Sequence, residues 1–96
     1  MPTYVSLVNW TDQGIRDVKE TLQRADATTE LAQKHGCSVQ LYWTVGAYDL
    51  LSILEAPDDE TATAFTLEAG SRGAVRTTTL RAYDREEMSS IVGRLG

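Results

Sequence analysis

The sequence predicts a small α+β domain of the ferredoxin-like class, in which a four-stranded antiparallel sheet carries two helices on one face. Strand-like and helix-like segments follow one another in the order β-α-β-β-α-β, with a short helix appended. The link between the second and third strands is so short that these strands must be antiparallel neighbours. Because 96 residues leave room for only one core, we expect a single domain over residues 1–96.

The first strand is expected at Thr3–Trp10, where β-favouring residues put apolar side chains on both faces of the chain. A helix follows, with Thr11 or Asp12 as its cap and Gly36 as the left-handed residue that ends it. This helical pattern is long, and its weak centre at residues 26–29 is where we expect it to bend. The stripe that it would turn towards the sheet consists of Ile15, Val18, Leu22, Ala25 and Ala32.

A hairpin is expected next, with strands at residues 38–44 and 48–55. The two strands are joined at Gly46 and Ala47, and a parallel return would need a crossover of about a dozen residues. Pro57 closes the hairpin's second strand, because proline cannot donate to the strand ladder.

The second half of the chain continues with a helix, a strand and a short C-terminal helix. Asp58 is expected to cap the first of these helices, and a fourth strand is expected at residues 74–83. Asp84 with Glu87 has the form of a capping box for the C-terminal helix. The expected inner residues are Ala62, Phe65 and Ala69 in the longer helix, with Leu67 at the margin, and Met88, Ile91, Val92 and Leu95 in the shorter one.

Charge and composition argue against several classes of partner. The net charge is −5 and the nine basic residues are scattered, so we expect no nucleic acid and no membrane surface as a partner. The N-terminus has no signal-peptide pattern and no apolar run approaches the ~20 residues of a membrane span, so a cytoplasmic location is expected. The single cysteine, Cys37, fits a reducing compartment and a buried structural thiol.

Both faces of the predicted sheet carry apolar residues, although two helices can cover only one face. Strand alternation puts Tyr4, Val8 and Trp10 on one side of the first strand and Val5 and Leu7 on the other. In the third strand it puts Leu50 and Leu54 on one side and Leu51 and Ile53 on the other. A large exposed apolar surface usually marks an interface. We therefore expect a homodimer or higher oligomer in which two sheets stack face to face across a two-fold axis.

Strong catalytic and metal-binding signatures are absent from the sequence. It contains no glycine-rich phosphate loop, no paired-cysteine spacing and no nucleophile elbow, and we predict no cofactor and no metal. The only histidine, His35, falls at a predicted helix C-terminus beside Gly36. The helix dipole explains this position better than a role as a haem ligand.

Asp49 is the one candidate catalytic residue, and it belongs to a cluster with Gly46 and Tyr48 at the hairpin turn. Strand parity puts Asp49 on an apolar face, where a carboxylate must be paired, hydrogen-bonded or raised in pKa, and a raised pKa would make it a usable base. In the alternative, Gly46 supplies a positive φ, Tyr48 packs, and Asp49 accepts backbone amides or pairs with Arg76 or Arg81. The structural alternative is favoured, because buried ion pairs are commoner than catalytic carboxylates.

An apolar pocket between the sheet and the helices is the form expected of a small-molecule site. Asn9 and Trp10 end the first strand, where an amide and an indole either orient an aromatic ligand or serve a loop and the core. Arg72 and Arg76 have the chemistry to clamp a carboxylate, although solvated surface pairs are the more common fate. The candidate ligand-binding residues are Asn9, Trp10, Tyr42, Trp43, Tyr48 and Asp49.

Segments 7–14, 42–49, 55–59, 73–77 and 80–82 together resemble the GYD domain family of small bacterial proteins. The family is named for a motif of Gly, Tyr and Asp, present here as Gly46, Tyr48 and Asp49. The resemblance implies a ferredoxin-like chain related to the dimeric α/β barrels, a group with cofactor-independent monooxygenases, haem-handling enzymes and isomerases. It implies no defined activity, because the family's biochemical function is undefined. Relatives tend to carry a proline near the position of Leu22, and this chain has none.

Three functions remain open from the sequence. The first, which we favour slightly, is a ligand-binding or accessory protein with an apolar pocket in each subunit. The second is a cofactor-independent enzyme, of monooxygenase or isomerase type, acting on a small aromatic or quinone-like molecule. The third is a structural oligomerisation module, which would have a filled interior.

Overall fold

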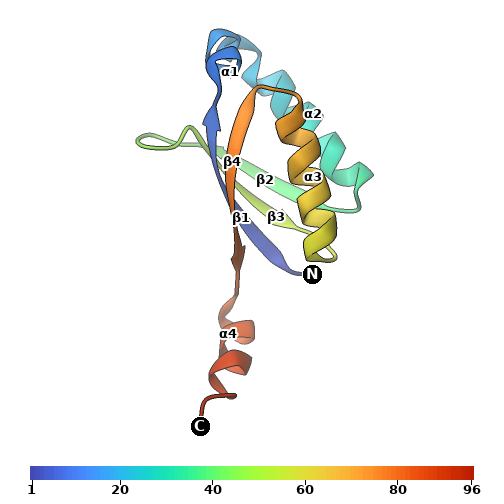
Figure 1. Ribbon diagram of the computed structural model, residues 1–96, viewed down its shortest axis with the longest axis vertical. Coiled ribbons are helices and arrows are strands. Elements are labelled where there is room, and N and C mark those ends of the chain that lie inside the picture. Colours follow the sequence, from blue (N-terminus) through green and yellow to red (C-terminus); the bar gives the residue numbers. More distant parts are fainter.

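The computed structural model describes residues 1–96 and has the predicted ferredoxin-like architecture (Figure 1). Its elements are β1 (Thr3–Trp10), α1 (Asp12–Arg16), the 3-10 turn η1 (Val18–Glu20), α2 (Thr21–Lys34), β2 (Ser38–Trp43), β3 (Leu50–Glu55), α3 (Asp59–Ser71), β4 (Val75–Ala82) and α4 (Arg85–Val92). The four strands form one antiparallel sheet in the order β2-β3-β1-β4. Helices α2 and α3 lie together on one face of this sheet (Figure 1).

The predicted parity of the two central strands is confirmed by their register. Tyr4 of β1 lies opposite Leu54 of β3, and Val8 lies opposite Leu50, all four on the helix-covered face. The main core lies at the end of this face near Tyr4, where Leu54 is only 1% exposed. That core consists of Tyr4, Leu31, Ala32, Cys37, Leu54, Ala56, Ala62 and Phe65, and the burial predicted for Cys37 is confirmed. Burial raises the pKa of the Cys37 thiol, as expected for a structural cysteine.

The first helical region bends, but the prediction of a bend at residues 26–29 is wrong. The break lies between α1 and α2, whereas α2 is continuous through residues 26–29. The cause is distant in sequence: α1 packs so closely on the start of β4 that a Cβ on Gly14 would overlap the carbonyl oxygen of Ala74. The Thr11 amide also donates to that oxygen at 3.1 Å, so α1 is held there while α2 follows the sheet in another direction. No proline is needed for the change of direction.

The break also changes which residues face the sheet. Ile15 and Leu22 were expected on the inner stripe, yet they are 51% and 66% exposed. Because η1 resets the helical phase, α2 turns Arg24, Ala25 and Thr28 inward before reaching buried Leu31 and Ala32. In α3 the inner residues Ala62, Phe65 and Ala69 are confirmed, whereas Leu67 is 69% exposed, because Thr66 takes the inward position instead.

The predicted helix caps are confirmed. The Asp58 carboxylate accepts hydrogen bonds from the backbone amide and from the hydroxyl of Thr61, each at 2.7 Å. The bond from the hydroxyl, followed by that from the amide, holds the pKa of Asp58 below its ordinary value. Asp84 and Glu87 form the reciprocal capping box of α4. Gly36 has a φ of 73°, the left-handed conformation expected of the residue after α2.

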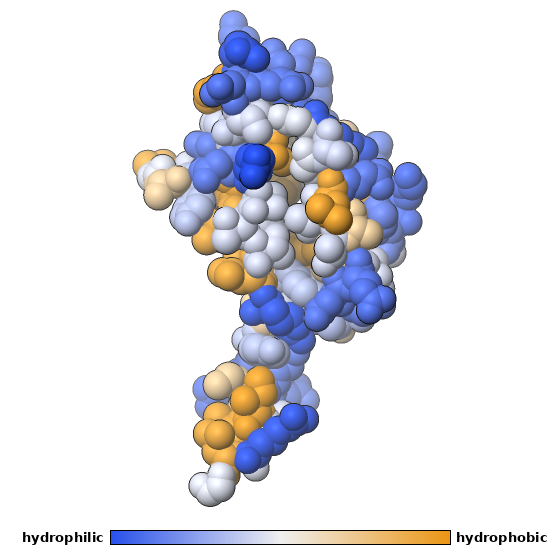
Figure 2. All heavy atoms as spheres, in the orientation of Figure 1, coloured by the Kyte–Doolittle hydropathy of each residue, from blue (hydrophilic) through white to orange (hydrophobic).

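Two apolar surfaces have no cover within the chain. The sheet face opposite the helices presents half-buried Val5, Leu7, Leu51 and Ile53. Helix α4 projects beyond the end of β4, and apolar side chains gather on it (Figures 1 and 2). The only side-chain hydrogen bond from α4 to the body joins Glu87 to Arg81 at 2.8 Å, and it lowers the pKa of Glu87. No helix is long and apolar enough to span a membrane.

Candidate functional site

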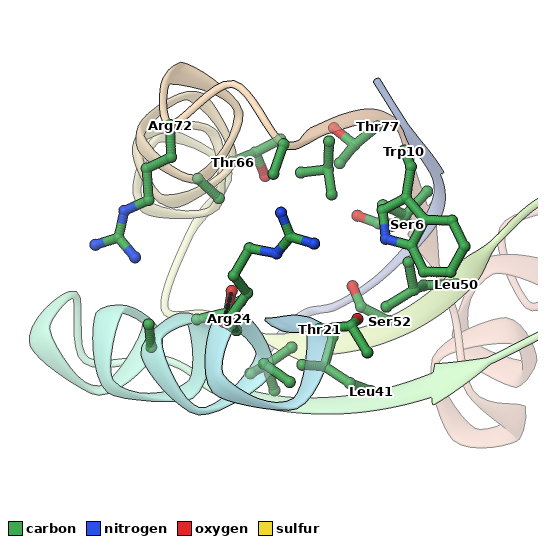
Figure 3. Close-up of a pocket in the computed structure, with 18 of the residues that line it drawn as sticks. Ser6, Trp10, Thr21, Arg24, Leu41, Leu50, Ser52, Thr66, Arg72 and Thr77 are labelled. Atoms are coloured by element: carbon green, nitrogen blue, oxygen red, sulfur yellow. Dashed lines mark hydrogen bonds between the residues drawn. The ribbon is translucent and has the colours of Figure 1, made fainter. Parts of the chain in front are cut away.

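A cavity of about 120 Å³ lies between the sheet and the helix pair, at the end of the layer away from the main core (Figure 3). Its walls come from the first half of α2, the second half of α3 and the ends of β1 and β4 that meet there. The lining residues share small or apolar side chains, apart from two arginines and several hydroxyl groups: Ser6, Val8, Trp10, Thr21, Arg24, Ala25, Ala27, Thr28, Val39, Leu41, Leu50, Ser52, Phe65, Thr66, Ala69, Arg72, Ala74, Val75 and Thr77.

The cavity exists because small residues stand where a core would carry large ones. Ser6 and Ser52 lie opposite each other at the middle of the two central strands, facing the helices. Across the layer, α2 contributes Ala25 and α3 contributes Ala69. Four small side chains therefore meet from four elements, and the volume between them stays unfilled.

The serine pair also gives the cavity a polar floor. The Ser6 hydroxyl has a partner, because its oxygen lies 2.9 Å from that of Thr79. Ser52 is only 6% exposed, and its hydroxyl forms no hydrogen bond within the chain, although it lies at the cavity (Figure 3). No buried side-chain nitrogen or oxygen of the chain lacks a hydrogen-bond partner, so the Ser52 oxygen is accessible from the cavity and is a polar group available to a ligand or to water there.

Arg24 is the most distinctive group in the cavity. Its half-buried side chain points into the space between the helices and the sheet, whereas Arg72 points away from it (Figure 3). One terminal nitrogen, Nη2, donates to the carbonyl oxygens of Gly14 at 3.0 Å and Asp17 at 2.8 Å. These bonds fix the guanidinium and also satisfy carbonyls at the end of α1. No carboxylate lies within 4 Å of Arg24, and none lines the cavity.

Of the six predicted ligand-binding residues, only Trp10 lines the cavity. Asn9 lies on the uncovered sheet face opposite Arg76, and Tyr42 lies on that face opposite Leu51. Trp43 lies beside the cavity without lining it, and its indole Nε1 donates to the Thr21 hydroxyl at 3.0 Å. Ligand binding by the five residues outside the cavity stays a prediction, and the cavity gives it no support.

Asp49 lies in the hairpin turn as the structural alternative proposed. Its carboxylate accepts the backbone amide of Trp10 at 2.9 Å, and its own amide donates to the carbonyl of Val8 at 2.9 Å. Asp49 forms no ion pair with Arg76 or Arg81, and Arg81 lies opposite Tyr4 at the other end of β1, where it binds Glu87. Gly46 has the positive φ expected of it, at 118°, so this motif shapes the hairpin and fastens it to the end of β1.

His35 ends α2 as expected and contacts α3. Its Nε2 lies 3.0 Å from the Glu68 carboxylate, and its ring meets Phe65 edge-on at 6.4 Å. The bond with His35 is the main reason that the pKa of Glu68 lies below its ordinary value. His35 thus joins the two helices at the packed end of the layer, away from the cavity. No group of three or more His, Cys, Asp and Glu side chains is placed to hold a metal ion.

Arg24 and the serine floor were missed by the sequence reasoning. Arg24 was assigned to the outer face of a continuous helix, and only the break before α2 turns it inward. The available signal was the serine at the centre of each central strand, because Ser6 and Ser52 interrupt otherwise apolar inward positions.

Known proteins similar to this chain agree on its fold and family. The profile of the GYD domain matches residues 4–92, so the chain belongs to the GYD domain family. It is 34% identical, over 99% of both chains, to a Thermus thermophilus protein named glutamine synthetase and cystathionine beta-lyase binding protein. A crystal structure assigned as a chlorite dismutase superposes with a TM-score of 0.59 at 13% identity, covering 96% of this chain and 48% of that one. At that identity the likeness shows the fold alone, and this chain spans about half the length of the dismutase.

Proposed function

We propose that this GYD domain protein is a non-catalytic accessory protein that binds a small molecule in the cavity between its sheet and helices. The observation that carries the proposal is the cavity itself, with apolar walls and the Ser52 hydroxyl on its floor. Ligand sites are typically apolar hollows with a few polar groups that fix the ligand's orientation.

The chemistry of the lining supports binding over catalysis. No Asp, Glu, His, Lys, Cys or Tyr side chain lines the cavity, so it lacks the groups that usually move a proton near neutral pH. The carboxylate of Asp49, the candidate base, accepts a hydrogen bond from the Trp10 amide, and Asp49 lies outside the cavity lining. Tyr4 is also unsuited to this role, because its hydrogen bond to Asp59, followed by burial, raises its pKa to about 12. A cofactor-independent enzyme is therefore the less supported alternative.

Self-association is the second part of the proposal. The uncovered sheet face carries Val5, Leu7, Leu51 and Ile53, and a second copy stacked across a two-fold axis would cover all of them. Helix α4 supports the same view, because it has only eight residues and its one side-chain hydrogen bond to the body joins Glu87 to Arg81. Isolated helices shorter than ~12 residues are marginal in water, so α4 requires contacts from another chain. The cytoplasm remains the predicted location.

A protein partner is the second candidate function. The Thermus relative is named as a binding protein for two enzymes, and its similarity extends over 99% of this chain. The hairpin tip offers exposed apolar side chains for such a contact, with Val45 fully exposed and Trp43 and Tyr48 partly so. Aromatic residues are enriched at protein interfaces. Binding of a small molecule and binding of an enzyme are compatible, because the cavity and the hairpin tip are separate surfaces.

Native mass spectrometry of the protein purified without added ligand tests both parts of the proposal. We expect a dimer or higher oligomer that carries one small molecule per chain. The variant Ala25→Leu fills the cavity from α2 and should lose that molecule, whereas Leu22→Ala, on the exposed side of the same helix, should keep it. A chain without any bound molecule, which also binds none in titrations, would refute the ligand-binding function. A monomer would refute the assembly.

A further inference from the structure

We propose that the cavity selects a small organic carboxylate, with the carboxylate bound to Arg24 and the apolar body against the cavity walls. This inference rests on the proposed function and adds the chemical class of the ligand. Its basis is the combination of one inward guanidinium, nearby hydroxyl groups and apolar walls in a space without any acidic side chain.

The charge of the cavity is opposite to that of the whole chain. The protein carries 14 acidic and nine basic residues, yet no acidic residue lines the cavity and two arginines do. Arg72 points away from the space, so Arg24 supplies the charge inside it (Figure 3). The half-buried Arg24 guanidinium has no carboxylate partner in the chain, so its charge is available to an anionic ligand.

The remaining donors of Arg24 match a carboxylate. A guanidinium has five N–H groups, and its Nη2 donates to Gly14 and Asp17. The N–H groups on Nε and Nη1 lie on different edges of the guanidinium and form none of the hydrogen bonds of Arg24 within the chain, so either edge can donate a charge-assisted hydrogen bond to a carboxylate oxygen. The two backbone bonds hold the guanidinium in place, so binding loses little side-chain freedom. The unpartnered Ser52 hydroxyl adds a further donor on the cavity floor.

The walls and the volume favour an organic body over a bare inorganic anion. The volume of about 120 Å³ is roughly ten times the ~10–15 Å³ that one buried water requires in this measure. Trp10, Phe65, Val8 and Leu50 provide apolar and aromatic contact surface around this space. A single ring or a short aliphatic chain with one carboxylate fits this combination of size, surface and charge.

Matched acid and amide pairs test the inference on the wild-type protein. Calorimetric titrations would use benzoate against benzamide and hexanoate against hexanamide, after removal of any co-purified molecule. Each amide keeps the shape of its acid and loses the charge. We expect each acid to bind at least about tenfold more tightly than its amide, the ratio that a charge-assisted hydrogen bond typically gives. Equal affinity within a pair would overturn the carboxylate assignment and leave the ligand-binding function standing.

Variants identify which side chains produce the preference for the acid over the amide. Arg24→Gln should reduce the acid-over-amide ratio to near one, and Ser52→Ala should weaken acid binding several-fold without touching the contacts of Arg24 with α1. Arg76→Gln is the matched control and should leave the ratio unchanged, because Arg76 is exposed, lies opposite Asn9 on the uncovered sheet face and is outside the cavity lining. If Arg24→Gln loosens α1, as its near-ultraviolet circular dichroism would reveal, Ser52→Ala and the amide comparison still decide the question.

Three further outcomes separate this inference from the function on which it rests. Inorganic phosphate that competes with benzoate at equal affinity would indicate a general anion site and overturn the assignment of an organic acid. If no acid or amide binds and no molecule co-purifies, both the inference and the ligand-binding function fail. If a neutral molecule co-purifies and binds to Arg24→Gln as tightly as to the wild type, only the inference fails.

Discussion

The two ends of the layer between the sheet and the helices are built from the same elements and filled differently. At the packed end, Tyr4 and Leu54 from the sheet meet Leu31 and Phe65 from the helices, and all four are buried. At the hollow end, the central strands contribute Ser6 and Ser52, and α2 and α3 contribute Ala25 and Ala69. The strands and both helices run through both ends, so the size of the side chains they contribute makes one end a core and the other a cavity.

Because of this difference, the packed end of the layer supplies stability and the hollow end is available for function. A domain of 96 residues has little apolar surface to bury, and leaving one end unfilled gives up part of that small total. The packed end therefore has to supply most of the stability of the fold. The hollow end is free to accept a ligand because the sheet beneath it is held by its ladder and by the packing at the other end.

The largest expected effect is a loss of stability from cavity creation at the packed end. Leu54→Ala removes the most deeply buried large side chain and should lower the free energy of unfolding by about 2–5 kcal/mol. Urea unfolding followed by circular dichroism measures this change. Leu22→Ala on the exposed side of α2 should change the same quantity by less than about 0.5 kcal/mol. A loss at position 54 no greater than that at position 22 would contradict the assignment of the core.

A second prediction compares the replacement of one alanine by leucine at each end of the layer between sheet and helices. Ala62→Leu overfills the packed end, where Ala62 is 3% exposed, and should destabilise the protein by about 1–3 kcal/mol. Ala25→Leu adds the same atoms at the hollow end, where it should be neutral or stabilise by up to about 2 kcal/mol. Both sites are helical and change identically, so helix propensity cancels in the comparison. Equal destabilisation in the two variants would mean that the hollow end is already filled.

The strands and the caps could be predicted because their signals are local. The alternation along β1 and the pairing of Asp84 with Glu87 each depend on a few neighbouring residues. The position of the break between α1 and α2 could not be predicted, because it depends on the close contact of Gly14 with Ala74, 60 positions away in the chain. An apolar stripe assumed to be continuous therefore placed Ile15 and Leu22 inside.

The site was harder to predict than the fold, because an unfilled volume is a property of several elements together. Ser6 or Ala69 alone is an ordinary small residue, and only the packing of α3 over β1 brings the two to one space. The Gly46, Tyr48 and Asp49 motif attracted attention because it is contiguous, yet it builds the hairpin turn. A contiguous motif is easy to notice, whereas the cavity draws single residues from six elements.

The last and smallest expected effect is a loss of stability in acid. It distinguishes the two ends of the layer because their titratable groups differ. Asp58 caps α3 at the packed end, and hydrogen bonds hold its pKa below its ordinary value of 3.8. Its stabilising contribution is therefore present at neutral pH and is lost as the pH falls through the lowered pKa of the folded state. Asp58→Asn keeps a competent cap that does not titrate, so this variant should lose less stability on acidification than the wild type. The measurement is the urea midpoint of each protein between neutral and acidic pH.

The control for this prediction is Asp26→Asn, on the exposed side of α2, where no side-chain hydrogen bond depends on the charge. Glu68 lies at the same end, and its pKa is also lowered, so the wild type should retain part of its acid sensitivity in the Asp58 variant. The hollow end has no carboxylate among its lining residues to protonate. Acid should therefore weaken the cap of α3 before it changes the cavity. Parallel stability curves for the wild type and Asp58→Asn would remove Asp58 as a source of acid sensitivity and leave that sensitivity to Glu68 and Glu87.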